Sequence, residues 1–397
     1  MLVPLRGNNM PRRLCAYLRF SRWLCYKIDK LTQEPICWST RIVPEAPTPQ
    51  PPNRLSLMII MILFSLFLAL VLGEIGLRAM GFKPWAPWTL METSVDNRHV
   101  AAMLAEKDPV RGWQNSPGSY TYSGYSPEVA EIVVNINDDG GRSTGIEKTP
   151  LNDTQDSIFF VGGSITMGYA ISDDETMAWK VASRYPDSKV FNYGVPGYGT
   201  LQALQALEEH LPKDQTKKII FYGLLEHHLN RNILDATWIT NFIGPGKGNL
   251  PPYAELDDNG NIVRKPPSTR MPWPLKDKLA MVQLAERSYI ETAFKSRSKD
   301  KQEVFRQLML EMVELGKANN AEVVVLFLKI TDKGREYFRP LLDAEKISYA
   351  ECTEAGNLVF QDEYRVTGEG HPNGEINTLF ADCVSTYIEE QTSNGRL

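Results

Sequence analysis

The chain has 397 residues, of which 43% are hydrophobic and 23% are charged. This composition is ordinary for a globular protein and predicts that most of the chain folds around a core. The formal net charge of -5 gives no reason to expect nucleic acid as a partner. Residues 1–54, however, carry nine Lys or Arg and only three acidic residues, which gives this segment alone a net charge of +6.

The basic segment 1–54 shows no sustained hydrophobic periodicity and ends in a proline-rich run at residues 44–52. Runs of this composition behave as extended linkers rather than as parts of a core. We therefore expect a poorly ordered tail before the first regular element.

An apolar run of 18 residues without charge or proline, Leu55–Leu72, follows the tail. As a helix it would span about 27 Å, close to the ~30 Å hydrocarbon core of a bilayer. A buried core helix is one alternative, but this run is apolar on every face. A cleavable signal peptide is another, but such a peptide normally has a shorter apolar region behind a short basic segment, whereas 54 residues precede this run. We expect residues 55–80 to form an uncleaved transmembrane signal anchor with a short helical extension, in which Glu74 and Arg78 are spaced to pair. The basic excess before the anchor places the N-terminus in the cytoplasm and residues 81–397 on the extracytoplasmic side, in the periplasm or at the cell surface.

The five cysteines divide between these two sides. Cys15, Cys25 and Cys37 lie in the tail, where we expect them to stay reduced, whereas Cys352 and Cys383 lie in the exported part, where a disulfide could form. The cysteine spacing does not match a zinc site, and we expect neither a metal nor a cofactor.

From about residue 108 the chain alternates short β-like runs with longer helical patterns. The expected strands are Glu131–Ile136, Ser157–Val161, Lys189–Tyr193, Lys218–Tyr222 and Glu322–Leu328, and the expected helices are Glu175–Arg184, Leu201–Leu211, Gln302–Asn319 and Glu375–Gln391. This alternation predicts a three-layer α/β/α sandwich with a mainly parallel sheet, whose reactive groups gather at the carboxyl ends of the strands.

Residues 229–298 do not follow this alternation, and we expect them to form an insertion in the domain. Long insertions at this edge of a sheet often form lids or substrate grooves. Its tryptophans, Trp238 and Trp273, could stack on sugar rings or simply pack the insertion onto the domain.

The candidate nucleophile is Ser164, which follows an expected strand and two glycines, Gly162 and Gly163. A strand, a glycine turn and a serine also suit a phosphate-binding turn, but the lysine and the length of a P-loop are missing. The segment is not a G-x-S-x-G elbow either, because Thr166 stands in the place of the second glycine. Ser164 therefore needs partners elsewhere in the chain.

Those partners are expected in the segment Gly368–Asn373, which reads GEGHPN and comes just before the last helix. Among the five histidines, only His371 stands in a glycine-flanked loop with an acid, Glu369, beside it. A histidine can accept the proton of a serine and return it to the leaving group, while a carboxylate orients the ring.

At these positions the chain resembles the SGNH/GDSL hydrolase family, in a membrane-anchored variant with Gly-Gly-Ser in the nucleophile block. The resemblance covers about residues 108–391 and rests on three segments, GGSITMGYAISDDETMAWKV, VFNYGVPGYGT and GEGHPN. It implies a flavodoxin-like fold, Ser164 as nucleophile and His371 as base. It also implies an oxyanion-binding N–H at Gly197, with Gly194 and Gly199 nearby.

Three positions depart from the family pattern. Gly163 replaces the usual Asp, and Gly368 stands where the acid is expected, which leaves Glu369 as the nearest carboxylate. The third block offers His227 where the family has an oxyanion-binding Asn, with the asparagines at 230 and 232 as further candidates. A metal site at His227 and its neighbour His228 is not expected, because adjacent residues on a strand point to opposite faces and no third ligand is near.

The sequence therefore predicts an ester hydrolase or O-acyltransferase that acts on an extracytoplasmic substrate, such as a small-molecule ester or an ester of a cell-envelope glycan or lipid. The membrane is the expected partner of Leu55–Leu72, and the sequence is silent on the oligomeric state. The alternative is a catalytically degenerate domain that binds envelope glycans or an assembly partner.

Overall fold

The computed structural model describes residues 53–86, 104–124, 131–145, 155–242 and 249–393. The chain divides into two compact units, Met1–Phe67 and Leu68–Leu397. The predicted tail lies outside the described residues except for Asn53 and Arg54, and so do its three cysteines.

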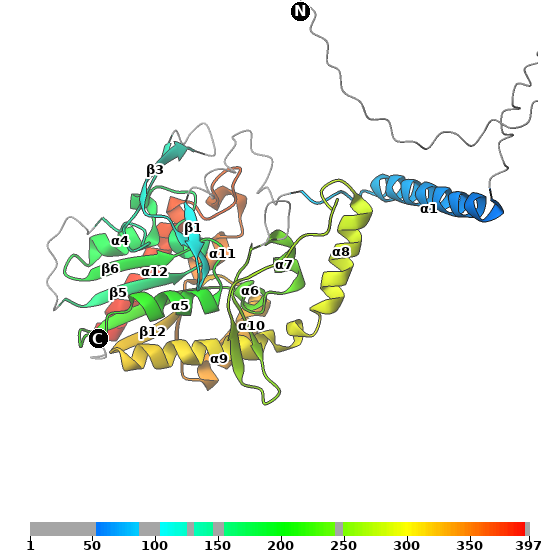
Figure 1. Cartoon of the computed structure of the whole chain (residues 1–397). Coiled ribbons are helices and arrows are strands. Elements are labelled where there is room, and N and C mark those ends of the chain that lie inside the picture. Colours follow the sequence, from blue (N-terminus) through cyan, green and yellow to red (C-terminus); the bar gives the residue numbers. More distant parts are fainter. Residues whose placement is uncertain (1–52, 87–103, 125–130, 146–154, 243–248, 394–397) are drawn as a thin grey trace, which may run out of the picture. The chain divides into compact units, whose positions relative to one another are not determined.

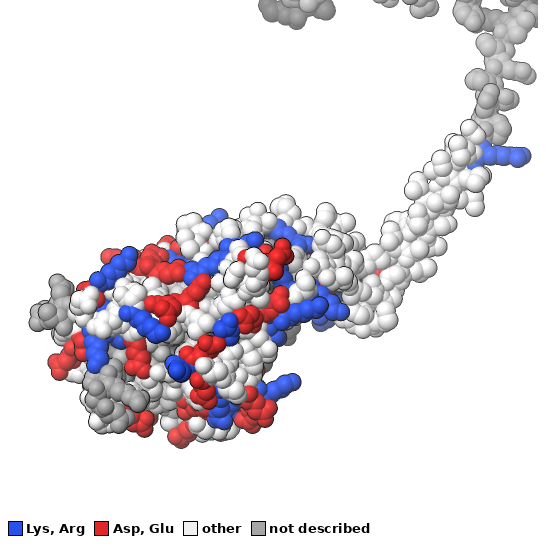
Figure 2. Space-filling view, turned by 90° about the horizontal axis from the view of Figure 1, so that it is seen from below, with Lys and Arg blue, Asp and Glu red and all other residues white. Residues whose placement is uncertain are grey.

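The helix α1, Arg54–Ala79, contains the predicted apolar run and is long and apolar enough to cross a membrane. None of its residues is buried, in agreement with its apolar character on every face. Figure 2 shows the helix as an almost entirely white surface, whereas the domain carries many acidic and basic side chains.

The centre of the domain is a five-stranded parallel sheet with the strand order β13-β12-β7-β5-β6. These strands are β5 (Ser157–Gly162), β6 (Lys189–Gly194), β7 (Lys218–Leu225), β12 (Ala321–Lys329) and β13 (Ser348–Glu351). In chain order the sheet runs 2-1-3-4-5, the flavodoxin-like order, whose direction of winding reverses between β5 and β7. The predicted parallel sheet and three-layer architecture are confirmed, and ligands in such folds bind at this reversal point.

Helices cover both faces of the sheet (Figure 1). One face is covered by α5 (Thr200–His210), α9 (Arg297–Ala318) and α10 (Asp332–Ala344), and the other by α4 (Met177–Arg184), α11 (Thr353–Leu358) and α12 (Gly374–Ser393). Alternation along the strands explains the two cores: Phe159 packs on the first face and Phe160 on the second, and both are fully buried.

Short antiparallel pairs surround the sheet. Two pairs precede it in the chain, β1 (Ala105–Asp108) with β2 (Gly112–Asn115) and β3 (Gly118–Ser123) with β4 (Glu131–Ile136). The expected insertion contains α6 (His228–Asn232), α7 (Ala236–Phe242), β8 (Asn249–Leu250) paired with β11 (Ser268–Thr269), β9 (Tyr253–Leu256) paired with β10 (Ile262–Lys265), and α8 (Ala280–Ala293). Both tryptophans pack on neighbouring side chains: Trp238 lies against the Arg231 guanidinium and Trp273 against the Tyr289 ring.

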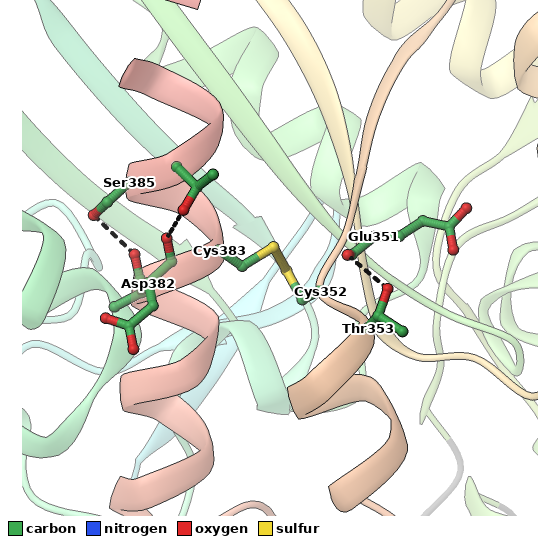
Figure 3. Close-up of a disulfide and its surroundings, with 8 residues drawn as sticks. Glu351, Cys352, Thr353, Asp382, Cys383 and Ser385 are labelled. Atoms are coloured by element: carbon green, nitrogen blue, oxygen red, sulfur yellow. Dashed lines mark hydrogen bonds between the residues drawn. A yellow bond between two sulfur atoms is a disulfide. The ribbon is translucent and has the colours of Figure 1, made fainter. Parts of the chain in front are cut away.

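A disulfide joins Cys352 and Cys383 (Figure 3). It connects the residue before α11 to α12, and Cys352 is buried in the core on that face of the sheet. The two cysteines are 31 residues apart in sequence, so the bond restricts a substantial loop of the unfolded chain.

Replacing both cysteines, with Cys352→Ser and Cys383→Ser together, is expected to lower the free energy of unfolding by about 3–4 kcal/mol, because a loop of this length loses its constraint. Urea denaturation with and without a reductant measures the effect. The reductant should destabilise the parent chain and leave the double variant unchanged. An equal response of the two proteins would show that the bond does not form.

Candidate active site

Ser164 begins the short helix α3, Ser164–Met167, immediately after β5. Its side chain is largely buried, with 8% of the residue exposed. The turn depends on Gly162, whose φ of +150° is a conformation that side chains disfavour. As the first residue of a helix, Ser164 has a backbone N–H without a partner inside that helix.

Glycines on the neighbouring strands make room for this turn. Gly194 on β6 and Gly223 on β7 stand beside Gly162 in the register of the sheet. A Cβ atom on Gly194 would lie 2.3 Å from the backbone nitrogen of Met167, and one on Gly223 would lie 2.1 Å from Thr166 Oγ1. α3 therefore packs directly against the ends of two strands.

A buried arginine holds the chain that leaves the nucleophile turn. Arg142 pairs with Asp173 at 2.9 Å and donates to the backbone oxygens of Met167, Gly168 and Ile171. The Arg142 side chain is 0% exposed, so these acceptors take the place of the water that would otherwise solvate its charge. The sequence gives no sign of this function, because the acceptors are backbone atoms about 25 residues farther along the chain.

The structure brings the three predicted residues of the catalytic set together. His371 Nε2 lies 2.7 Å from Ser164 Oγ, and His371 Nδ1 lies 2.7 and 2.8 Å from the two carboxylate oxygens of Glu369. These distances are within the 2.6–3.2 Å hydrogen-bond range that proton transfer requires. The arrangement can take a proton from the serine and stabilise the resulting imidazolium.

The loop that carries Glu369 is shaped by its glycines. Gly368 and Gly370 have φ values of +77° and +93°, and this conformation lets Glu369 fold back onto a histidine only two residues away. One Glu369 oxygen also accepts the backbone N–H of His371 at 2.8 Å, and the residue is only 3% exposed. The Tyr169 ring packs beside the imidazole, with 5.1 Å between ring centroids.

The predicted oxyanion residue Gly197 lies in the loop between β6 and α5. Its φ of +89° is left-handed, and an added Cβ would lie 2.9 Å from the Trp113 ring. Trp113 holds the loop through a hydrogen bond from its Nε1 to the Pro196 oxygen and another from the Tyr198 hydroxyl to the Trp113 oxygen. Within the described residues, the Gly197 N–H has no intramolecular hydrogen bond, so it is free to bind a ligand.

Of the three candidates in the third block, two are occupied elsewhere. Asn232 is buried and accepts the Thr200 N–H at 2.7 Å, which fixes the start of α5, and Asn230 accepts from Lys301 at 3.2 Å. His227 remains, at the junction of β7 and α6. Partial desolvation by the surrounding chain and the positive charge of Arg231 lower the pKa of His227, although the residue is exposed at the surface. The ring is thus neutral near pH 7 and carries one N–H donor.

A buried network that sequence analysis did not identify lies behind His227. Asn232 donates to Thr200, Thr200 and Tyr222 share a 2.7 Å hydrogen bond, and Tyr222 lies 2.7 Å from His228 Nδ1. Each hydroxyl proton has an acceptor if donation runs from Asn232 to Thr200, from Thr200 to Tyr222 and from Tyr222 to His228 Nδ1. His228 Nδ1 is then an acceptor, so the ring proton of His228 is assigned to Nε2. Burial also lowers the pKa of His228 well below its usual value, so the ring is neutral.

This network ends beside Gly163, where the resembled family has Asp. A Cβ on Gly163 would lie 3.2 Å from His228 Nε2 and 3.3 Å from an Arg231 nitrogen. Arg231 donates to the Tyr198 oxygen at 2.8 Å, and burial lowers the pKa of Arg231 to about 9, so it remains charged at pH 7. An imidazole and a guanidinium thus border Gly163. Among the residues that the structure describes, no group of three or more His, Cys, Asp or Glu could hold a metal ion.

No protein-family model matches this sequence, and no curated protein does. Solved structures with a similar course of the chain include a member of the G-D-S-L lipolytic family from Veillonella parvula, with 13% identity over 58% of this chain and 97% of that chain and a TM-score of 0.35. A psychrotrophic esterase from Pseudoalteromonas sp. is 12% identical over 60% of this chain and 98% of that chain, with a TM-score of 0.33. An acetylxylan esterase from Geobacillus stearothermophilus is 12% identical over 59% and 94% of the two chains, with a TM-score of 0.31. These similarities concern the fold alone.

The close approach of β6 to α3 predicts unequal effects of two glycine substitutions. Gly194→Ala is expected to destabilise the protein by about 1–3 kcal/mol or more, because the new methyl group meets backbone atoms that cannot move aside. Gly163→Ala should cost much less, since φ there is -92° and the nearest atoms include the ends of two side chains. Urea denaturation of both variants measures the difference, and equal stability of the two would contradict the proposed packing.

Proposed function

We propose that this protein is a serine-dependent ester hydrolase or O-acyltransferase of the SGNH/GDSL type. The observation that carries the proposal is the hydrogen-bonded chain from Ser164 through His371 to Glu369, with distances of 2.7 Å on both sides of the imidazole. A buried carboxylate, a histidine and a serine in this order form the general arrangement for nucleophilic acyl transfer.

In the proposed reaction, Ser164 Oγ attacks the ester carbonyl carbon while His371 Nε2 accepts the hydroxyl proton. The tetrahedral intermediate then expels the alcohol, which takes this proton from His371 and leaves an acyl group on Ser164. Water or an acceptor hydroxyl attacks the acyl-enzyme, again giving its proton to His371, and the serine is released with that proton. With water the outcome is hydrolysis, and with a sugar hydroxyl it is transfer.

Three donors are proposed to stabilise the oxyanion of the intermediate. They are the backbone N–H groups of Ser164 and Gly197 and the neutral ring of His227. Each is placed at the carboxyl end of a strand, where β5, β6 and β7 lie side by side. Fixed donors at such positions stabilise the transition state more than the ground state.

The location of the substrate is proposed from the N-terminal part of the chain and from the disulfide. A basic tail before an apolar helix favours an anchor whose N-terminus is cytoplasmic, and a disulfide between Cys352 and Cys383 suits an oxidising compartment. The proposed substrates are therefore esters of envelope glycans or lipids on the extracytoplasmic side.

A fluorophosphonate probe, which reacts with activated serines, tests the nucleophile. We expect labelling of the parent chain and its complete loss in Ser164→Ala. Ser183→Ala, which removes an exposed hydroxyl on α4, is the matched control and should label normally. A folded parent chain that never labels would overturn the enzyme proposal and favour the non-catalytic, glycan-binding alternative.

The role of His227 is tested by comparing two variants on a p-nitrophenyl acetate assay. His227→Ala is expected to lower kcat by about 10²–10³-fold, the usual effect of losing one oxyanion donor. His227→Asn should recover part of that loss, because its amide can donate a hydrogen bond from a similar position. If kcat of His227→Ala equals that of the parent chain, His227 is not an oxyanion donor.

A further inference from the structure

Five large apolar side chains are exposed around the end of α1, and the catalytic chemistry does not require them. Met80 and Phe82 follow α1, whereas Met271, Trp273 and Leu275 precede α8. Met271 is 85% exposed, Met80 is 68% exposed and Leu275 is 58% exposed. We call these five residues the juxtamembrane patch. Clustered apolar exposure of this kind marks an interaction surface.

The two segments that contribute to the patch are joined by hydrogen bonds. The Trp85 N–H donates to the Lys276 oxygen at 2.9 Å, and the Arg78 guanidinium donates to the Lys278 oxygen at 2.7 Å. Lys276 also forms a buried ion pair with Glu286 of α8 at 2.6 Å. The segment after α1 therefore runs beside the segment before α8.

The end of α1 is also fixed to the first turn of α8. The Glu74 carboxylate accepts the N–H groups of Ala280 and Met281, at 2.8 and 3.0 Å, which are the first two residues of α8 and have no acceptor inside that helix. Gly73 permits this approach, since a Cβ there would lie 3.3 Å from the Met281 methyl group.

These contacts place the patch at the level where the apolar helix ends. The apolar run ends at Leu72, and Glu74 is the first charged residue after Arg54. Met80 is six residues beyond Glu74, which corresponds to about 9 Å along a helix. The polar region on each side of a bilayer is about 5–8 Å thick, so Met80 lies at the outer edge of the headgroup region, and tilting of the helix brings the patch deeper into that region.

The residues around the patch suit a lipid surface. Tryptophan is enriched at the membrane interface, and Trp273 belongs to the patch. Lys83 and Lys278 are exposed beside it, and long basic side chains can reach anionic headgroups while their stems cover apolar surface.

We propose that the juxtamembrane patch inserts into the interface of the same bilayer that α1 crosses and thereby holds the catalytic domain against the membrane. This inference rests on the proposed anchor. The domain would then have a defined orientation on the lipid surface instead of moving freely on a linker.

The test uses nitroxide labels on the full chain in nanodiscs of phosphatidylcholine and phosphatidylglycerol, with Cys15, Cys25 and Cys37 replaced by serine. Labels are placed one at a time at Leu275→Cys in the patch, at Leu63→Cys in α1 and at Val133→Cys, an exposed apolar position on β4. Power-saturation electron paramagnetic resonance then compares access of each label to oxygen, which dissolves in lipid, and to a water-soluble nickel chelate.

We expect the label at position 275 to be several-fold less accessible to the nickel chelate than the label at position 133. Its accessibility to oxygen should be high, like that of the label at position 63. If the label at 63 is in lipid and the label at 275 is as open to nickel as that at 133, the patch does not bind the membrane although the anchor does. If the label at 63 is also open to nickel, the anchor itself is wrong and the patch proposal falls with it. Loss of probe labelling at Ser164 affects neither result, so the catalytic proposal is tested separately.

Discussion

The hydrogen bond between Ser164 Oγ and His371 Nε2 joins two residues that are 207 positions apart. Neither residue can reach the other unless the sheet places the end of β5 next to the loop before α12. The core provides that placement, because β5 is buried along its whole length between two other strands of the sheet. A displacement of about 1 Å at such a contact can lower the rate on the order of 10²-fold.

Several local contacts fix the positions of α3 and of the Gly197 loop more closely than the core alone does. Glycines at the ends of three adjacent strands let α3 lie against the sheet, and Arg142 holds the chain that follows α3 by its backbone oxygens. The loop of Gly197 is held from two directions, by Trp113 on one side and by the Arg231 hydrogen bond to Tyr198 on the other. Because buried polar groups are costly when unpaired, these contacts favour one arrangement of the site over its alternatives.

The sequence allowed a correct prediction of the parallel sheet type, of four of its five strands and of most helices that cover it, whereas the expected strand Glu131–Ile136 pairs with β3 outside that sheet. Ser164, His371 and Glu369 also lie together as expected. Those elements have strong hydrophobic patterns, as in β12, or they carry residue types with recognisable chemistry. β13 was missed because its four residues, Ser348–Glu351, form a short edge strand without an apolar run. α10 was missed because its sequence contains Gly334 and Pro340, which normally argue against a helix.

The supporting residues could not be predicted for a different reason. Arg142 and Arg231 act through backbone oxygens, and any residue can supply such an acceptor, so no pattern in the sequence marks the pairing. The network from Asn232 to His228 likewise depends on which side chains face inward where α5, β7 and α6 meet. Glu369 is an intermediate case. The sequence singled out the residue as a candidate, but its contact with His371 depends on the φ values of Gly368 and Gly370, which the sequence does not show.

The proposed mechanism requires that Ser164 forms a covalent acyl intermediate with the help of His371. Rapid acid quenching of the full chain during turnover of p-nitrophenyl acetate, followed by peptide mass spectrometry, tests it most directly. We expect one added acetyl group on the peptide that contains Ser164, and no such group in His371→Ala. Turnover without any acetylated Ser164 peptide, or with the acetyl group on another residue, would contradict it.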